Sequence, residues 1–291
     1  MEFNADFFKE EVRSDFLVTE KMKKIWAIEL NLLVEFDRVC KKHGLKWFVD
    51  YGTLLGAARH QGFIPWDDDV DVSMFRVDYM KLLTIAPNEF RDPYFFQSAY
   101  TDEKIWPFSK LRDSRTTAIE FPEKKKMNQG IFIDIFPLDD VPANKDNSAV
   151  FRIQTELWFT IMAPHIIVRG LNEPRYPFVL DRDIILDLLQ NYDDAQKLAE
   201  FEKFNLSHFG EADHVNFLAE EISKVSPSKN KEYYREIIYL PFENITVPAP
   251  KGYEEILSIQ YGDWHKFVQG TSFHEGIFFD PDNPYTKYIS Q

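Results

Sequence analysis

The chain has 291 residues, of which 44% are hydrophobic and 28% charged, and its formal net charge is −14. This composition is typical of a globular protein and excludes disordered, collagen-like and coiled-coil classes. The excess of acidic residues repels phosphate backbones, so we expect no nucleic acid partner. Cys40 is the only cysteine, which excludes an intrachain disulfide and a Cys-rich zinc site. Because the acidic start lacks the order of a signal peptide, we expect a soluble cytoplasmic protein, able to associate peripherally with the inner face of a membrane.

The first half of the chain predicts helices and strands in alternation. Apolar residues at helical spacing predict a helix over Glu20–His43, which Gly44 ends. A short strand at 46–50, a turn at Gly52 and Thr53, and a small-residue helix at 54–60 follow. The next strand is predicted at 69–74, a helix at 77–85, and further strands at 94–98, 109–112, 117–121 and 130–136.

Beyond Pro142 the pattern becomes mainly helical, most clearly over 182–209, and a last helix is predicted at 253–260 after a proline-rich stretch. No repeat or flexible linker separates the two halves. We therefore expect an α+β protein in one compact body. Its residues 1–145 form a mixed sheet flanked by helices, and its residues 146–291 form a helical addition.

Acidic residues at 67–71 are the most informative feature of the sequence. On a strand, residues i and i+2 point the same way, so Asp69 and Asp71 are able to bind a hard divalent cation together. Asp134 interrupts the apolar strand predicted at 130–136, where an unpaired carboxylate is costly unless a cation lies beside it. The alternatives are a solvated acidic loop and, for Asp134, a buried pair with an arginine.

Two other metal-binding patterns fit less well. The residues Asp67, Asp69 and Asp71 match the first positions of a calcium loop, but Val72 stands where that loop requires glycine. A short Asp-x-Asp pair is also common in sugar transferases and does not by itself distinguish sugar transfer from phosphate transfer.

The order of the parts narrows the choice. The order of elements resembles the core of the nucleotidyltransferase superfamily: a strand, the Gly52-Thr53 turn, a short helix, the acidic strand and, later, Asp134. In that superfamily the turn holds the phosphates of a nucleotide at a helix N-terminus. The stretch 47–71, WFVDYGTLLGAARHQGFIPWDDDVD, resembles the signature of the LicD family of bacterial phosphocholine transferases, related to the fukutin group. Further matching segments are KLRD (110–113), FIDIFPLD (132–139), APKGY (249–253) and YGDW (261–264).

This resemblance implies a nucleotidyltransferase-like fold and a function. It implies metal-dependent transfer of phosphocholine from CDP-choline to a sugar hydroxyl of a lipopolysaccharide or teichoic acid precursor, which is a lipid-linked glycan, with release of CMP. Two Mg²⁺ or Mn²⁺ ions are implied, with Asp69 and Asp71 as catalytic metal ligands. Asp134 is implied as the third catalytic carboxylate, either a ligand or the base that takes the acceptor proton. Asp67 is a weaker ligand candidate and Asp68 a weaker one still. The second half, residues 146–291, is implied to complete the donor and acceptor site.

Several residues of the matching segments are candidates for binding the substrate. Gly52 and Thr53 are expected to hold the phosphate end of the donor. Arg59, Lys110 and Arg112 offer cations for the diphosphate, with ordinary ion pairs as the alternative for each. His60 suits helix capping or packing as well as acid–base work.

Three alternatives remain open from the sequence. One is transfer of another phospho-alcohol from a CDP donor, and another is nucleotidyl transfer with release of pyrophosphate. The third is a non-catalytic protein that binds choline or polysaccharide. The aromatic residues that would surround a choline group are not assigned.

Overall fold

The computed structural model describes residues 1–103, 106–270 and 276–289, and its contacts divide the chain into two compact units. The first unit comprises Met1–Phe136 and Tyr233–Gln291, and the second comprises Pro137–Glu232. The sequence predicted one body with a boundary at 145. The division differs because the residues after 232 pack with the N-terminal part: hairpin β11–β12 (Ile237–Phe242 and Ile245–Pro250) contacts α2 (Tyr51–His60) and β3 (Phe48–Val49).

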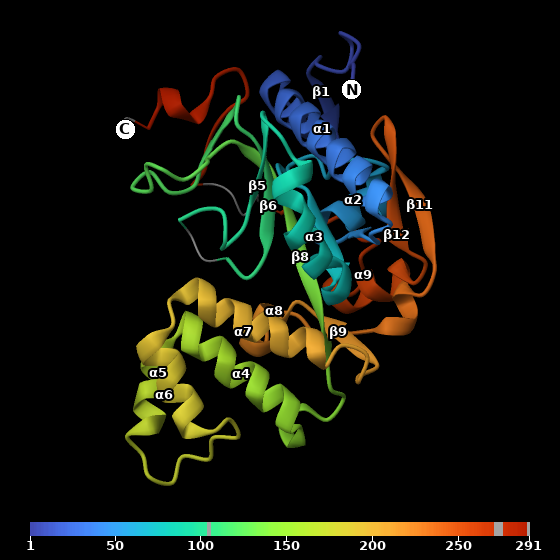
Figure 1. The fold of residues 1–291 in the computed structure, drawn as a ribbon. Coiled ribbons are helices and arrows are strands. Elements are labelled where there is room, and N and C mark those ends of the chain that lie inside the picture. The colour runs from blue at the N-terminus through green and yellow to red at the C-terminus, as the bar shows by residue number, and fades with distance from the viewer. Residues whose placement is uncertain (104–105, 271–275, 290–291) are drawn as a thin grey trace. The chain divides into compact units, whose positions relative to one another are not determined.

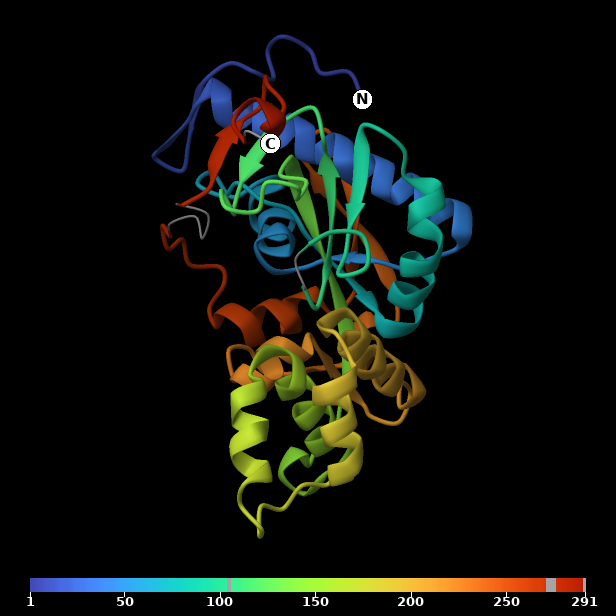
Figure 2. The same cartoon turned by 60° about the vertical axis from the view of Figure 1, so that its left-hand side comes forward.

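Within the first unit, strands and helices alternate over the N-terminal part (Figures 1 and 2). Besides the elements already named, its helices are α1 (Glu20–His43), α3 (Arg76–Glu89), α9 (Tyr253–Tyr261) and the 3₁₀ turn η3 (Tyr285–Lys287). Its other strands are β1 (Glu11–Arg13), β2 (Phe16–Val18), β4 (Asp71–Phe75), β5 (Tyr94–Gln97), β6 (Ser109–Asp113), β7 (Thr117–Ile119), β8 (Ile131–Val141) and β13 (Phe278–Asp280).

The main sheet of this unit has β8 at its centre, with β4 and then β3 on one side and β6 and then β5 on the other. β6 runs antiparallel to β8, with Lys110 opposite Asp134. Outside this sheet, β1 pairs with β2, β7 with β13, and β11 with β12, all antiparallel. The predicted mixed sheet flanked by helices is thereby confirmed.

The second unit begins within β8, which runs on past Phe136 to Val141. Residues 139–141 of β8 pair with β9 (His214–Asn216), and β9 pairs with β10 (Lys229–Asn230). The helices of this unit are α4 (Ala149–Met162), α5 (Pro164–Leu171), α6 (Arg182–Asn191), α7 (Asp194–Ser207) and α8 (Leu218–Ser223). Two 3₁₀ turns, η1 (Lys145–Asn147) and η2 (Lys231–Tyr234), complete the described elements.

Long helices and buried strands follow the sequence pattern, and capping residues set their ends. Thr19 caps α1 at its start, and Gly44 adopts the left-handed conformation (φ 63°) at its end. The helical pattern predicted most clearly over 182–209 is confirmed, and it forms two helices because Asp193 caps α7 and forms a capping box with Gln196. No described helix has the length and apolar content needed to span a bilayer.

Candidate active site

The turn before α2 is built around Asp50, which lies at the N-cap of that helix. Its Oδ1 accepts the N–H of Tyr51 at 2.8 Å, and its Oδ2 accepts the hydroxyl of Ser73 at 2.6 Å. Gly52 and Thr53 therefore lie in the first helical turn, whose N–H groups have no partner within the helix. Tyr51 has a φ of 44°, an uncommon conformation for a residue with a side chain. The predicted phosphate-binding turn is thus a true helix N-terminus.

Gly52 and Thr53 also contact the acidic segment. A Cβ atom on Gly52 would lie 2.6 Å from Oδ2 of Asp67, so any side chain at this position would displace the Asp67 carboxylate. The buried Thr53 hydroxyl accepts the N–H of Asp71 at 2.8 Å. The helix N-terminus and the carboxylates are therefore held side by side.

The acidic segment, Asp67–Asp69, precedes its strand, since β4 begins only at Asp71. The expected strand geometry at Asp69 is therefore not seen, and the segment follows a turn after Ile64. One carboxylate oxygen each from Asp67, Asp68 and Asp69 lies within 4.8 Å of the others. When several oxygens bind one cation at metal–oxygen distances of about 2.1–2.6 Å, the oxygens lie at separations from one another that are comparable to those in this group. Asp68 thus joins the group, although it was the weakest of the predicted ligand candidates.

Asp71 and Asp134 lie on neighbouring strands beside this segment. The N–H of Asp134 donates to the carbonyl of Val70 at 2.8 Å, which places the two acidic positions next to each other. Burial raises the pKa of Asp71 well above its usual value, and the negative charges of Asp69 and Asp134 raise it further. The structure therefore places Asp71 and Asp134 next to each other and near Asp69, while the oxygens that lie within 4.8 Å of one another are those of Asp67, Asp68 and Asp69.

Asp134 faces a buried cation, Lys110, whose Nζ lies 3.0 Å from Oδ1. Lys110 also pairs with Glu120 at 3.2 Å. Burial raises the pKa of Asp134, and Lys110 offsets part of this rise. For Glu120, burial alone would raise the pKa, but Lys110 and Arg112 outweigh it and hold the pKa at about 2.

Arg112 is fully buried, and its guanidinium is occupied by protein acceptors. It donates to Oε1 of Gln97 at 2.6 Å and to the carbonyl of Gly130 at 2.8 Å, and it pairs with Glu120. Arg112 therefore forms the ordinary ion pair that was given as the alternative to binding the diphosphate. A role in binding phosphate would require these bonds to break.

Arg59 and His60 end helix α2 near the YGDW segment. Arg59 donates to the carbonyls of Trp264 and Lys266 at 3.0 and 3.1 Å, and its Nε donates to Nε2 of His60. Burial, and secondarily Arg59, lowers the pKa of His60 to about 4. His60 is therefore neutral at neutral pH and accepts a bond from its neighbour, which agrees with a packing role.

Aromatic side chains form a continuous group beside Asp134, which the sequence did not assign. Tyr51 packs against Phe136 at 5.4 Å between ring centroids, Phe136 against Phe108 at 4.8 Å, and Trp106 against both Phe108 and Phe121. These five rings, hereafter the aromatic wall, are all partly exposed. A cation already lies at one end of the wall, because Nζ of Lys110 is 5.5 Å from the Trp106 centroid.

Two further polar residues of the site lay outside the sequence prediction. Gln260 of α9 donates to Oδ1 of Asp50 at 3.1 Å, across 210 positions of sequence. Glu29 is buried on α1, with 1% of its surface exposed. It shares a helix face with Ile25, Trp26 and Leu33. A charged residue on the apolar face of the predicted helix was therefore the sequence feature that could have indicated Glu29.

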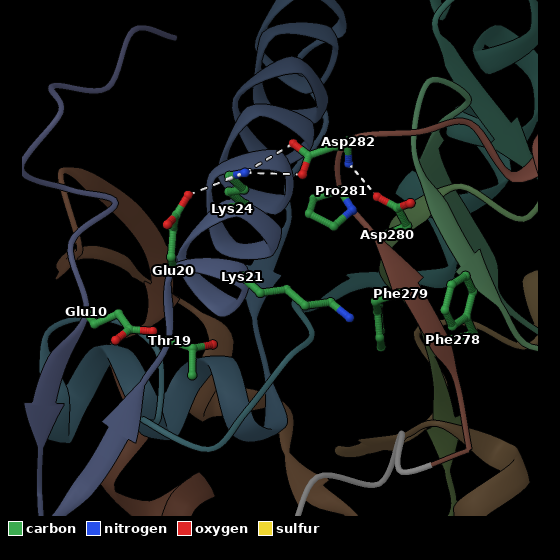
Figure 3. Close-up of a pocket in the computed structure, with 10 residues that line it drawn as sticks. All are labelled: Glu10, Thr19, Glu20, Lys21, Lys24, Phe278, Phe279, Asp280, Pro281 and Asp282. Atoms are coloured by element: carbon green, nitrogen blue, oxygen red, sulfur yellow. Dashed lines mark hydrogen bonds and ion pairs between the residues drawn. The ribbon is translucent and has the colours of Figure 1, made fainter.

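A pocket of 680 Å³ lies elsewhere in the first unit, between the start of α1 and β13 (Figure 3). Lys24 bridges Glu20 and Asp282 at its rim, with distances of 3.4 and 3.1 Å. The residues that line it include none of the predicted site residues. This pocket is therefore separate from the candidate active site, although its volume is large enough for a small ligand.

Comparison with known proteins agrees with the geometry. The chain is 27% identical to the lipopolysaccharide cholinephosphotransferase LicD of Haemophilus influenzae over 84% of its own length and 93% of that protein. It is 33% identical to an uncharacterized protein of Rickettsia prowazekii over 38% of this chain and 39% of the relative. It is 26% identical to the mouse ribitol 5-phosphate transferase FKRP, over 34% of this chain and 18% of that protein.

The family described as LicD/FKTN/FKRP, nucleotidyltransferase domain, matches residues 44–164. This range contains the α2 turn, the acidic segment, Lys110 and Asp134. Over these residues the chain is therefore similar to the nucleotidyltransferase domain of the LicD/FKTN/FKRP family.

Proposed function

We propose that this protein transfers phosphocholine from CDP-choline to a sugar hydroxyl of a lipid-linked cell-surface glycan precursor and releases CMP. The similarity to a cholinephosphotransferase over most of both chains supports the class of reaction. The observation that carries the proposal is the convergence of Asp69, Asp71 and Asp134 beside a helix N-terminus. That arrangement suits a donor with two phosphates.

The acidic residues fit a divalent cation such as Mg²⁺ or Mn²⁺. Oxygens of Asp67, Asp68 and Asp69 lie within 4.8 Å of one another. Burial raises the pKa of Asp71, and repulsion by the negative charges of Asp69 and Asp134 raises it further. Such repulsion is relieved when a cation is bound. Asp67, Asp69, Asp71 and Asp134 would hold one or two ions. A bound cation would neutralise charge on the phosphates and stabilise the leaving oxygen.

The remaining chemistry belongs to side chains of the protein. The acceptor oxygen forms a bond to the phosphorus that carries choline, and the bond from that phosphorus to the bridging oxygen breaks. CMP leaves with the bridging oxygen. Asp134 is positioned to take the acceptor proton, with Lys110 at 3.0 Å to orient its carboxylate. The N–H groups of Gly52 and Thr53, in the first turn of α2, would donate to the donor phosphates.

The aromatic wall supports choline as the transferred alcohol. A quaternary ammonium donates no hydrogen bonds and is recognised by aromatic faces with carboxylates nearby. Tyr51, Phe136, Phe108, Trp106 and Phe121 offer such faces next to Asp134 and Glu120. The same proposal places the protein inside the cell, at a membrane surface where lipid-linked acceptors are available.

The test is release of CMP from CDP-choline, CDP-glycerol and CDP-ribitol in the presence of Mg²⁺ and a glycan acceptor. CDP-choline is expected to give the fastest release, and Asp69→Asn is expected to lower it at least about 10²-fold. A faster reaction with CDP-glycerol or CDP-ribitol would replace choline with another alcohol. Pyrophosphate release from a nucleoside triphosphate would favour nucleotidyl transfer, and binding without turnover would favour the non-catalytic alternative.

A further inference from the structure

The indole of Trp26 connects helix α1 to the acidic segment. The residue is fully buried, and its indole N–H donates to the backbone carbonyl of Asp67 at 2.9 Å. The N–H of Asp67 donates in turn to the carbonyl of Ile64 at 2.9 Å. Both backbone polar groups of Asp67 are therefore bonded, one within its own turn and the other to α1. The backbone is thus held at the first residue of the acidic segment.

The ring of Trp26 is itself held from several directions. It stacks on Phe63, with ring centroids 4.6 Å apart and an angle of 3° between the planes. Arg13 and Lys23 lie over the ring at 5.3 and 5.2 Å from its centroid, within the range of cation–π attraction. Arg13 also pairs with Glu243, whose Oε1 accepts the N–H of Phe63 at 3.2 Å. The direction of the indole N–H is therefore fixed by its surroundings.

Asp67 is the residue through which this contact reaches the site. Its Oδ2 lies next to Gly52 in the first turn of α2, where a Cβ atom would approach it to 2.6 Å. Its carboxylate also belongs to the group of oxygens, with those of Asp68 and Asp69, that lie within 4.8 Å of one another. A shift of the backbone at Asp67 would move these carboxylates relative to the helix N-terminus. Displacements of about 1 Å are costly at a reacting centre.

We propose that Trp26 is a positioning residue of the active site. Its indole N–H fixes the backbone at Asp67 and thereby sets where the three carboxylates lie beside the N-terminus of α2. Trp26 lies outside residues 44–164, the range that matches the family domain, so α1 supplies a contact that the domain alone lacks. The inference rests on the proposed cation binding and transfer at this site. The alternative is that the Asp67 carbonyl only satisfies a buried indole.

The experiment removes the indole N–H from the full-length protein. Trp26→Phe keeps an aromatic ring, and we expect amide hydrogen exchange over residues 64–71 to become about fivefold faster. Mn²⁺ binding without nucleotide is measured by calorimetry and electron paramagnetic resonance, and its affinity is expected to fall about tenfold, the scale of losing a group that orients a metal ligand. At saturating Mn²⁺, kcat for CMP release from CDP-choline is expected to fall by a similar factor.

Trp47→Phe is the matched control. Trp47 is also buried, and its indole N–H donates to Oδ1 of Asp37 at 3.2 Å while its ring packs against Phe36. Both variants lose one hydrogen bond and part of a buried ring, so both are expected to lower the melting temperature by a few degrees. Trp47→Phe is expected to keep the wild-type exchange over residues 64–71, the wild-type Mn²⁺ affinity and the wild-type kcat.

A second variant separates the hydrogen bond from packing. Benzothienylalanine, introduced at position 26, replaces the indole N–H with sulfur and keeps the size of the ring. It is expected to show the losses of Trp26→Phe with a smaller change in melting temperature, and it tests the inference should Trp26→Phe fail to fold. Wild-type exchange over residues 64–71 or wild-type Mn²⁺ affinity in this variant would overturn the inference.

The inference and the proposed function have separate outcomes. Weaker Mn²⁺ binding in the position-26 variants, with no CMP release by the wild type, would support the positioning role and contradict the proposed function. Wild-type Mn²⁺ affinity and wild-type CMP release in those variants would overturn the positioning role alone. Equal losses in Trp26→Phe and Trp47→Phe, or no Mn²⁺ binding by the wild type, would also overturn it.

Discussion

Gly52 is the residue at which the helix N-terminus and the acidic segment approach most closely. A methyl group there would meet Oδ2 of Asp67 at 2.6 Å. Because that neighbour is the end of a movable side chain, we expect Gly52→Ala to change the melting temperature little. Displacing Asp67 is expected to lower CMP release by about 10²-fold, the scale of small misplacements at a reacting centre.

The matched control is Gly276→Ala, because nothing lies within 4 Å of a Cβ atom at Gly276. Kinetics and thermal melts of both variants provide the measurement. Equal activity of the two variants would show that Asp67 does not need its present position.

The aromatic wall gives a second prediction for a single residue. Trp106→Leu keeps apolar bulk and removes an aromatic face, whose contact with a cation contributes up to about 2 kcal/mol when desolvated. Binding of CDP-choline is expected to weaken about tenfold, whereas binding of CDP-glycerol changes much less. Calorimetry with Ca²⁺ in place of Mg²⁺ measures both donors. A parallel loss for the two donors would mean that Trp106 only supports the fold.

Residues with a strong local signal were predictable from the sequence, and those with long-range partners were not. The acidic run and the single carboxylate in an apolar strand indicated Asp69, Asp71 and Asp134 directly. The contact between Gln260 and Asp50 spans 210 positions, and no local pattern records it. Arg112 carried a local signal for phosphate, but its bonds to Gln97 and Gly130 depend on strand pairing and a loop.

At the scale of elements, strands β6 and β8 meet through a buried group of charges, Lys110, Arg112, Glu120 and Asp134. Glu120 has its pKa lowered from 4.5 to about 2 in the folded protein. Its charge therefore stabilises the fold above pH 4.5, and this contribution is lost as the pH falls from about 4.5 to about 2.

Glu120→Gln is expected to lower the free energy of unfolding at pH 7 by about 3 kcal/mol. The difference from wild type is expected to shrink as the pH falls through this window. Urea unfolding of both proteins between pH 7 and pH 3 measures it. A difference that is constant with pH would show that Glu120 acts by packing alone.

Element types followed the hydrophobic pattern where segments were long, as in α1 and β8. The proline-rich stretch before the last helix was not predicted as strands, because proline cannot donate to a sheet. It forms β12 and the end of β11 in a two-stranded hairpin, which is a position that tolerates proline. The compact units are divided after residues 136 and 232 because this hairpin belongs with the N-terminal part, and only its contacts reveal this.

At the scale of the whole molecule, each of the two units has its own buried residues. A ligand that binds only the folded protein stabilises the part that holds it. We expect Mn²⁺ to slow amide hydrogen exchange in α1, α2 and the acidic segment, with little effect on α4–α7. Mass spectrometry of peptides with and without Mn²⁺ measures this. Equal protection of α4–α7 would contradict a site confined to the first unit.

The first unit is interrupted in sequence by the second, and this has a consequence during synthesis. A ribosome releases the acidic segment and Asp134 long before Glu243, Gln260 and Trp264, the residues that contact Phe63, Asp50 and Arg59. A nascent chain that stops after residue 164 would contain the whole family domain and every predicted metal ligand. It would lack the hairpin and α9 that pack on α2, so the site is completed only when translation is nearly finished.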